Sequence, residues 1–308
     1  MSTVLVGLLW GLASAQQAPS PFEEEGAETE ATEPTVIDLG QTPADILERA
    51  RSVSHLPLAE RMDTVSQSLL GRPYLSDPLG EGAGIDADPF ARYDVFDCLT
   101  YVEEVLALSL AGDPSHAAGI RTRLRYGDAT PTYTSRRHFM ELQWIPANIE
   151  DGWMRDATAD YGETVDLTRE WTLAGWQEWG RRNLFHHTDD ELPVGKMSLR
   201  VLPLETALQV ADQIRPGSIL LTVREDRPWV PLWVTHVGLV FHDEGKPVVR
   251  HATKMGQGLV RDHSLIWYLE HIGTYSNWKT LGVAILEPIP MGPRVSRHPV
   301  PSPDAPAP

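Results

Sequence analysis

The sequence predicts an α+β fold in which helices come first and an antiparallel sheet follows. In the first part of the chain, apolar residues recur every three or four positions, which is the period of an amphipathic helix. Beyond residue 217 the pattern changes to short β-rich runs that are bounded by Gly, Pro and charged turns. Helices that precede strands, instead of alternating with them, favour α+β over α/β.

Three helices are expected before residue 113. The first begins with Thr42 as its N-cap and Pro43 at its first helical position. The second spans 58–70 and is ended by a Gly and a Pro, and the third spans 97–110 and ends before a Gly. The third helix has the clearest apolar stripe, so it is the best-defined element of the sequence.

The strands are expected in the second half of the chain. A charged segment at 243–246 (Asp-Glu-Gly-Lys) has the composition of a hairpin loop, so the strands on either side of it should be antiparallel neighbours. Residues 113–205 hold many aromatic residues and predict no clear element. The four predicted strands span 218–223, 232–241, 247–252 and 281–286.

The folded domain is expected to span residues 41–288. Residues 1–15 are apolar, end in a small-x-small pattern and are too short to cross a membrane, so they predict a signal peptide cleaved near Ala15, although no basic residue precedes them. Residues 16–40 are expected to be a disordered acidic linker, and residues 289–308 a Pro-rich disordered tail. We therefore expect a periplasmic or secreted protein without stable membrane insertion.

The charge of the chain excludes some partners. Its net charge is −17 at pH 7, whereas nucleic-acid binding relies on Lys and Arg that neutralise phosphates. Anionic membrane surfaces attract basic segments for the same reason. Neither nucleic acid nor a membrane is an expected partner, and we expect a monomer.

Cys98 is the only cysteine and follows directly after Asp97. In an oxidising compartment structural cysteines normally come in pairs, so a lone thiol needs another explanation. By residue type alone, a small buried apolar residue is the simpler interpretation. However, Asp is a favoured N-cap, which places the sulfur in the first turn of a helix, where free N–H groups lower a thiol pKa and can receive an oxyanion. This position predicts a nucleophile.

His236 is the candidate base for that nucleophile. Strand alternation places it on one face with Gly238, which leaves open space beside the imidazole. A half-buried structural histidine is the alternative for any single His. Across the predicted hairpin, His251 could accept the ring N–H and fix the tautomer of the base, and its alternative is a surface histidine on an edge strand.

These motifs resemble the NlpC-type cell-wall peptidases, a bacterial branch of the papain-like superfamily. Residues 96–100 (Phe-Asp-Cys-Leu-Thr) are similar to the Asp-Cys-Ser/Thr motif of that family, with Leu99 in the place of Ser. Residues 235–240 (Thr-His-Val-Gly-Leu-Val) resemble its His-Val-Gly-Ile strand. The His-Ala pair at 251–252 resembles the segment that supplies its third catalytic residue.

The long interval between the cysteine and histidine motifs points to a particular relative, the N-acetylmuramoyl-L-alanine amidase-like family. The resemblance covers most of residues 58–286, and Arg136 departs from it where a smaller polar residue is expected. It implies a papain-like α+β domain with a large insert between Cys98 and His236, and hydrolysis of an amide bond in peptidoglycan or a muropeptide. It implies no metal and no organic cofactor. The segments that carry it are Leu-Gly-Arg-Pro-Tyr at 70–74, Asp-Cys-Leu-Thr-Tyr-Val-Glu at 97–103, Ser-Arg-Arg-His-Phe at 135–139 with Trp144, and Arg-Pro-Gly-Ser-Ile at 215–219.

Further residues are candidates for substrate contact. In the insert, Arg137 could bind a carboxylate in a fork and Trp144 could stack on a sugar, with His138 between them in sequence. Local packing and ion pairing is the alternative for these three. Tyr93 and Asp94 precede the nucleophile and could touch substrate, and Asp97 lies beside it.

Three alternative functions stay open. Zinc amidases act on the same polymer, and the densest cluster of metal-ligand types is His186-His187 with Asp189 and Asp190. Adjacent histidines are not a preferred ligand spacing and no His-Glu-x-x-His motif occurs, so this cluster is expected to be a solvated loop. A non-catalytic wall-binding module and an acyltransferase that uses the same thioester are the other two.

Overall fold

The centre of the fold is an antiparallel sheet of eight strands. In the computed structural model, which describes residues 42–180 and 185–290, the strand order is β2-β3-β8-β4-β5-β6-β7, and β1 pairs with β8. All of these pairs are antiparallel, which confirms the α+β prediction. The strands are β1 (Met154–Asp156), β2 (Val165–Trp171), β3 (Gly195–Pro203), β4 (Ile219–Arg224), β5 (Val234–Asp243), β6 (Lys246–Thr253), β7 (Leu259–Ser264) and β8 (Thr280–Pro288).

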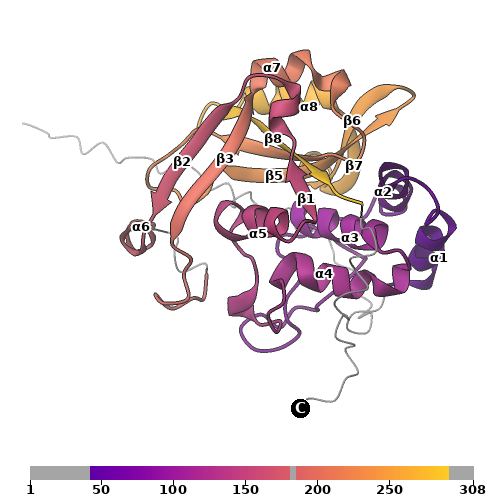
Figure 1. Cartoon of the computed structure of the whole chain (residues 1–308), viewed down its shortest axis with the longest axis horizontal. Helices are drawn as coiled ribbons and strands as arrows, with labels where there is room; N and C mark the ends of the chain where they lie inside the picture. Colours follow the sequence, from indigo (N-terminus) through magenta and orange to yellow (C-terminus); the bar gives the residue numbers. More distant parts are fainter. Residues whose placement is uncertain (1–41, 181–184, 291–308) are drawn as a thin grey trace, which may run out of the picture. The chain divides into compact units, whose positions relative to one another are not determined.

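Helices cover both faces of this sheet (Figure 1). One apolar core joins α1, α2 and α3 to a face that includes Val237 and Leu239. A second core joins α7 and α8 to the opposite face, which includes Val240 and Val249. The helices are α1 (Ala44–Ser52), α2 (Leu58–Gln67), α3 (Cys98–Leu110), α4 (Ala117–Tyr126), α5 (Ile145–Glu150), α6 (Leu173–Glu178), α7 (Leu204–Gln209) and α8 (Leu265–Gly273).

The predicted helices form, with one correction at α1. Thr42 is not the N-cap, because its hydroxyl bonds to the Tyr93 hydroxyl at 2.9 Å and Pro43 occupies the cap position instead. The second predicted helix ends at Gln67, three residues early, and continues as a turn. The third begins at Cys98 with Asp97 as its N-cap, as the sequence predicts.

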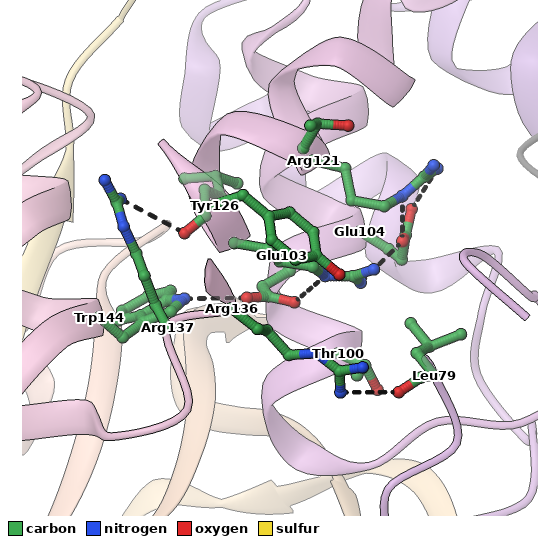
Figure 2. A network of polar contacts seen from close by, with 12 residues as sticks. Leu79, Thr100, Glu103, Glu104, Arg121, Tyr126, Arg136, Arg137 and Trp144 are labelled. Carbon is green, nitrogen blue, oxygen red and sulfur yellow. Dashed lines mark hydrogen bonds and ion pairs between the residues drawn. The ribbon is translucent and has the colours of Figure 1, made fainter. Parts of the chain in front are cut away.

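Helix α3 runs through the interior, because every residue from 101 to 110 is buried. Two of these residues are acids, and a buried carboxylate is tolerated only when it is paired and hydrogen-bonded. Glu104 forms an ion pair with Arg121, and Glu103 forms one with Arg125 of the same helix, α4 (Figure 2). These pairs fix α3 against α4 and thereby fix the position of its first turn.

The predicted hairpin between β5 and β6 is confirmed. Asp243 pairs with Lys246, so the loop consists of Glu244 and Gly245 alone. Both have positive φ, +47° and +77°, as the tight turn of a two-residue hairpin requires. The short loop sets the register of the two strands, and that register determines where His236 and His251 lie.

Four strands, β1, β2, β3 and β7, were not predicted from the sequence. β2 and β7 hold mostly polar residues and are largely half-buried or exposed, so they lack an apolar alternation. The β2–β3 hairpin belongs to the insert and extends the sheet beyond β8. The insert is therefore part of the main sheet.

Several predictions concern the ends of the chain. The predicted signal peptide (1–15) and acidic linker (16–40) lie outside the described residues, as does the predicted tail from residue 291 onward. Within residues 42–180 and 185–290, no helix has the length and apolar composition that crossing a membrane requires.

Candidate active site

Cys98 is the first residue of α3 and lies against the sheet. Asp97 and Thr100 form a capping box, in which the Asp97 carboxylate accepts the Thr100 N–H at 2.8 Å and the Thr100 hydroxyl accepts the Asp97 N–H at 3.0 Å. The backbone N–H of Val237 in β5 acts on the Cys98 thiol and lowers its pKa. Cys98 as a residue is only partly buried, although its thiol group is desolvated.

The thiol is protonated in the resting protein. Burial raises the pKa of Cys98 to about 12, and the negative charge of Asp97 acts in the same direction. The N–H groups of Val237, Cys98 and Leu99 oppose this rise without cancelling it. The prediction of a low pKa for this thiol is therefore wrong, because desolvation outweighs the lowering effect of the N–H groups at the helix N-terminus. A nucleophile of this kind needs a base during the reaction.

His236 lies on β5 directly before Val237, the residue whose N–H lowers the pKa of Cys98. Burial lowers the pKa of His236 to about 4, and the positive charge of Arg224 adds to this effect. The imidazole is therefore neutral near pH 7 and can accept a proton. The fold thus brings the residue that follows this neutral histidine close to the protonated thiol.

His251 lies on β6 beside the base. Its Nδ1 is 2.7 Å from Nε2 of His236, and its ring packs edge-on against Tyr268. The side chain is fully buried and β6 lies between β5 and β7, so the alternative of a surface histidine on an edge strand is wrong. Burial holds the pKa of His251 well below its usual value, so it is a neutral partner.

Gly238 allows this close approach. A Cβ at this position would lie 2.8 Å from Cγ2 of Val249 and 3.1 Å from the Cβ of His251. The prediction that Gly238 leaves open space beside the base is therefore wrong, because these two side chains fill that space. The glycine is needed so that β6 can present His251 to His236.

A third histidine joins the pair. Nε2 of His251 is 2.9 Å from Nδ1 of His263, which lies on β7. Sequence reasoning missed His263 because its strand is polar and was not predicted. The only sequence signal for His263 is that it lies in the segment that follows His251.

Glu141, from the insert, holds the start of β5. Its Oε1 accepts the backbone N–H groups of Trp233 and Val234 at 2.6 Å and 2.5 Å. The side chain is buried, and burial raises its pKa to about 6. The insert therefore positions the strand that carries His236, which the sequence did not predict.

Two predicted substrate residues belong to the core. Trp144 is fully buried and its indole N–H donates to Glu103 at 2.9 Å (Figure 2). Tyr93 is also buried, and its hydroxyl donates to Glu104 at 2.8 Å. The predictions that Trp144 stacks on a sugar and that Tyr93 touches substrate are therefore wrong, because each ring instead satisfies a buried carboxylate.

The other candidates have local partners. Arg92 forms a two-point ion pair with Asp94. Arg137 donates to Asn148 at 2.8 Å and to Asp151 at 2.7 Å, which is the local packing that was the alternative to substrate binding. Asp97 serves as the cap of α3, so its carboxylate is held by Thr100.

Arg136, which departs from the family pattern, holds the segment before α3 in place through hydrogen bonds. It donates to Glu81 at 2.7 Å and to Asp86 at 2.8 Å. It also donates to the Leu79 carbonyl at 3.0 Å (Figure 2). A smaller polar residue could not make these three contacts together.

The histidine-rich segment packs into an aromatic cluster. His138 bonds to the Tyr133 carbonyl at 2.7 Å, and the ring of His187 lies 5.0 Å from that of His138. His186 is exposed, but His187 is buried, so the expectation of a solvated loop is wrong for His187. In the part of the chain that the structure describes, no three His, Cys, Asp or Glu side chains are grouped so that they could hold a metal ion.

Comparisons with known proteins place this chain in a family. A protein from Legionella pneumophila superposes with a TM-score of 0.70 at 21% identity, over 80% of this chain and 94% of that one. An N-acetylmuramoyl-L-alanine amidase from Bacteroides uniformis superposes with a TM-score of 0.59 at 22% identity, over 75% and 98%. At these identities the likeness concerns the fold. No curated protein sequence matches the chain.

The family model described as N-acetylmuramoyl-L-alanine amidase-like matches residues 64–275. The matched region contains Cys98, His236, His251 and His263, and it spans well over half of the chain. The chain therefore belongs to the N-acetylmuramoyl-L-alanine amidase-like family.

Proposed function

We propose that the chain is an exported cysteine amidase of the papain-like, NlpC-type class that hydrolyses amide bonds in peptidoglycan. Its family indicates a peptidoglycan-related hydrolase that acts outside the cytoplasm. The observation that carries the proposal is that the backbone N–H of Val237, the residue after His236, acts on the Cys98 thiol, while His236 itself is hydrogen-bonded to His251. A helix supplies the nucleophile and the sheet supplies the base and its partner.

In the first step the Cys98 thiol proton passes to Nδ1 of His236, and the sulfur attacks the carbonyl carbon of the amide. The transfer accompanies the attack, because both groups are neutral beforehand. His251 occupies Nε2 of His236, so Nδ1 is the ring nitrogen left for this proton. The sulfur–carbon bond that forms converts the carbonyl oxygen to an oxyanion.

The oxyanion needs hydrogen-bond donors. Asp97 already accepts the Thr100 N–H, so the N–H groups of Cys98 and Leu99 are the donors of the first turn that face the new charge. The Val237 N–H, which also acts on the thiol, is a third candidate donor.

In the second half of the reaction the amine leaves with the proton from His236, and a thioester remains on Cys98. His236 then takes a proton from water, and the hydroxide attacks the thioester carbon. The carboxylic acid product leaves and loses its proton to the solvent, and the thiolate regains its proton from His236. Only the thiol, the imidazole and water exchange atoms or protons in these steps.

The bond that we propose is the amide between N-acetylmuramic acid and L-Ala, with a bond of the stem peptide as the alternative. The family description names the first of these bonds. Acyl transfer to an amine would pass through the same thioester, and it would give a new amide in place of the carboxylate.

Mass spectrometry of muropeptide products tests the proposal. The wild-type protein should release a free peptide with N-terminal L-Ala, and Cys98→Ala and His236→Asn should release none. His242→Asn is the matched control, because His242 lies on the same strand and is exposed. Iodoacetamide should abolish activity and EDTA should not. Loss of activity in EDTA together with full activity of Cys98→Ala would support a zinc amidase and overturn the proposal.

Binding to sacculi by the wild-type protein without release of any product would instead indicate a wall-binding module. A cysteine at a capped helix start, close to a strand that carries a neutral histidine, has no role in such a module. An enzyme is therefore favoured over a wall-binding module.

A further inference from the structure

Both ring nitrogens of His251 face another imidazole. Nδ1 of His251 is 2.7 Å from Nε2 of His236, and Nε2 of His251 is 2.9 Å from Nδ1 of His263. The three rings therefore form a chain that crosses β5, β6 and β7. It begins at the proposed base and ends at His263, which is partly exposed.

The sheet register places these rings on one face. Val249 pairs with His263 and His251 pairs with Arg261, so His251 and His263 are diagonal neighbours on adjacent strands. Arg250, whose side chain alternates with that of His251, forms a two-point ion pair with Asp262 at 2.7 Å and 2.8 Å. This pair resists a shift of β7 along β6, and it holds His263 within reach of His251.

A neutral imidazole has one N–H donor and one lone pair. His251 is fully buried and neutral, and its pKa is held well below the usual value by burial and by His236 and His263. Its two hydrogen bonds must therefore run in the same direction along the chain. Either His263 accepts from His251 and His251 accepts from His236, or both bonds are reversed.

Only one of these directions is compatible with catalysis. When His263 accepts, each histidine carries its proton on Nε2, and Nδ1 of His236 has a free lone pair for the Cys98 proton. In the reversed direction Nε2 of His236 accepts and its Nδ1 is already protonated, so it cannot act as a base. Whether Nδ1 of His263 accepts the hydrogen bond from His251 therefore decides which of the two directions is present.

We infer that His263 is a positioning residue that fixes His236 in the tautomer with a free Nδ1, by accepting a hydrogen bond from the intervening His251. This inference rests on the proposed function and extends it from three residues to four. No bond to substrate is involved, and His263 acts through His251 alone.

The surroundings of His263 fit an acceptor that stays neutral. Trp267 of α8 covers its ring at 4.7 Å, and the Trp267 ring stacks in turn on His271 at 5.0 Å. Burial lowers the pKa of His263, the positive charges of Arg261 and His271 act in the same direction, and Asp262 opposes them. A neutral His263 keeps the lone pair on Nδ1 that His251 requires.

The test compares two substitutions of equal size. His263→Asn places an amide oxygen where Nδ1 was and can accept the bond, whereas His263→Leu places a methyl group there. We expect Asn to retain kcat within a few-fold of the wild type. We expect Leu to lose kcat by roughly 10- to 100-fold at unchanged KM, since loss of an outer partner of a functional histidine has effects of this size.

Nitrogen-15 NMR of the histidine side chains gives a readout that needs no substrate. The wild-type protein and the Asn variant should show His236 and His251 with the proton on Nε2, and the Leu variant should show a mixture of tautomers. A wild-type His236 with its proton on Nδ1 would overturn the inference. So would a Leu variant whose kcat and tautomers equal those of the wild type.

The outcome is separable from that of the proposed function. If Cys98→Ala cleaves muropeptides as the wild type does, the proposed function fails, whatever the histidine tautomers are. If Cys98→Ala is inactive but the tautomer of His236 does not depend on residue 263, only the inference fails. If His263→Leu does not fold, the wild-type tautomers alone decide.

Discussion

Cys98 and His236 are both neutral in the resting protein near pH 7. Burial raises the pKa of the thiol to about 12 and lowers that of the imidazole to about 4. The order of these two values means that a thiolate–imidazolium pair does not form before substrate arrives. The proton must move during the attack on the carbonyl, and the precise placement of Nδ1 therefore matters more than stored charge.

The pH dependence of activity and of alkylation follows from the raised pKa of Cys98 and the lowered pKa of His236. Activity should fall on the acid side only as His236 becomes protonated, near pH 4, and should be level around neutrality. The rate of Cys98 alkylation by iodoacetamide should keep rising with pH through about pH 9, because the thiolate fraction keeps growing. An alkylation rate that is constant from about pH 6 to pH 9 would show a preformed ion pair and contradict this account.

Gly238 is a second point where a single residue decides the site. An added Cβ would meet Val249 and His251 at 2.8 Å and 3.1 Å, so Gly238→Ala should destabilise the protein by about 1–3 kcal/mol in urea unfolding. Its kcat should fall as well, because His251 must move. Gly112→Ala is the control, since a Cβ there meets nothing within 4 Å. Equal stability of the two variants would contradict the close packing at His251.

At the scale of elements, the proposed site depends on how β5 is held at its start. Glu141 accepts two buried N–H groups there, and an unsatisfied buried donor costs about 1–3 kcal/mol. Glu141→Ala should therefore lower the free energy of unfolding by at least this amount, and Glu141→Gln, which keeps one acceptor oxygen, by less. Urea unfolding measures both effects.

The control for this prediction is Glu150→Ala, which removes an exposed carboxylate of α5 from the same insert. It should leave the unfolding free energy within about 0.5 kcal/mol of the wild type. If Glu141→Ala is as mild as Glu150→Ala, the insert does not anchor β5.

The elements nearest the site were the most predictable from the sequence. The Asp97 cap, the apolar stripe of α3 and the Asp-Glu-Gly-Lys hairpin are local signals, because each depends on residues a few positions apart. The polar strands β2 and β7 gave no such signal, and they form because they pair with β3 and β6. His263 was not predicted, because its strand was not predicted.

The wrong predictions share a physical cause. Tyr93 and Trp144 are residue types that are common in binding sites, but here each bonds to a buried acid of α3. Likewise the pKa of Cys98 depends on burial by the sheet, which outweighs the helix terminus that the sequence shows. Contacts between distant segments decide these cases, and a single sequence does not contain them.

For the whole molecule, the three neutral histidines make stability depend on pH. The folded-state pKa values of His236, His251 and His263 are all lowered, so their contribution is present above the unfolded value of about 6.5 and is lost as the pH falls through the folded values. The melting temperature should therefore drop between pH 7 and pH 5. Glu141, whose folded pKa is raised to about 6, has the opposite sign.

His251→Leu should reduce this pH dependence, because it removes the most buried of the three groups. Differential scanning calorimetry at pH 7 and pH 5 compares the two proteins. His242→Leu, an exposed position on β5, should keep the wild-type pH dependence. A His251→Leu protein with a steeper fall than the wild type would contradict the assignment of buried neutral histidines.

The most direct test of the central claim is the intact mass of the protein after an acid quench during turnover of a muropeptide. The account predicts an added mass equal to the acyl part of the substrate, located on Cys98 by peptide mapping and absent from Cys98→Ala, which should release no product. Product release by Cys98→Ala at the wild-type rate would contradict the claim that this thiol is the nucleophile.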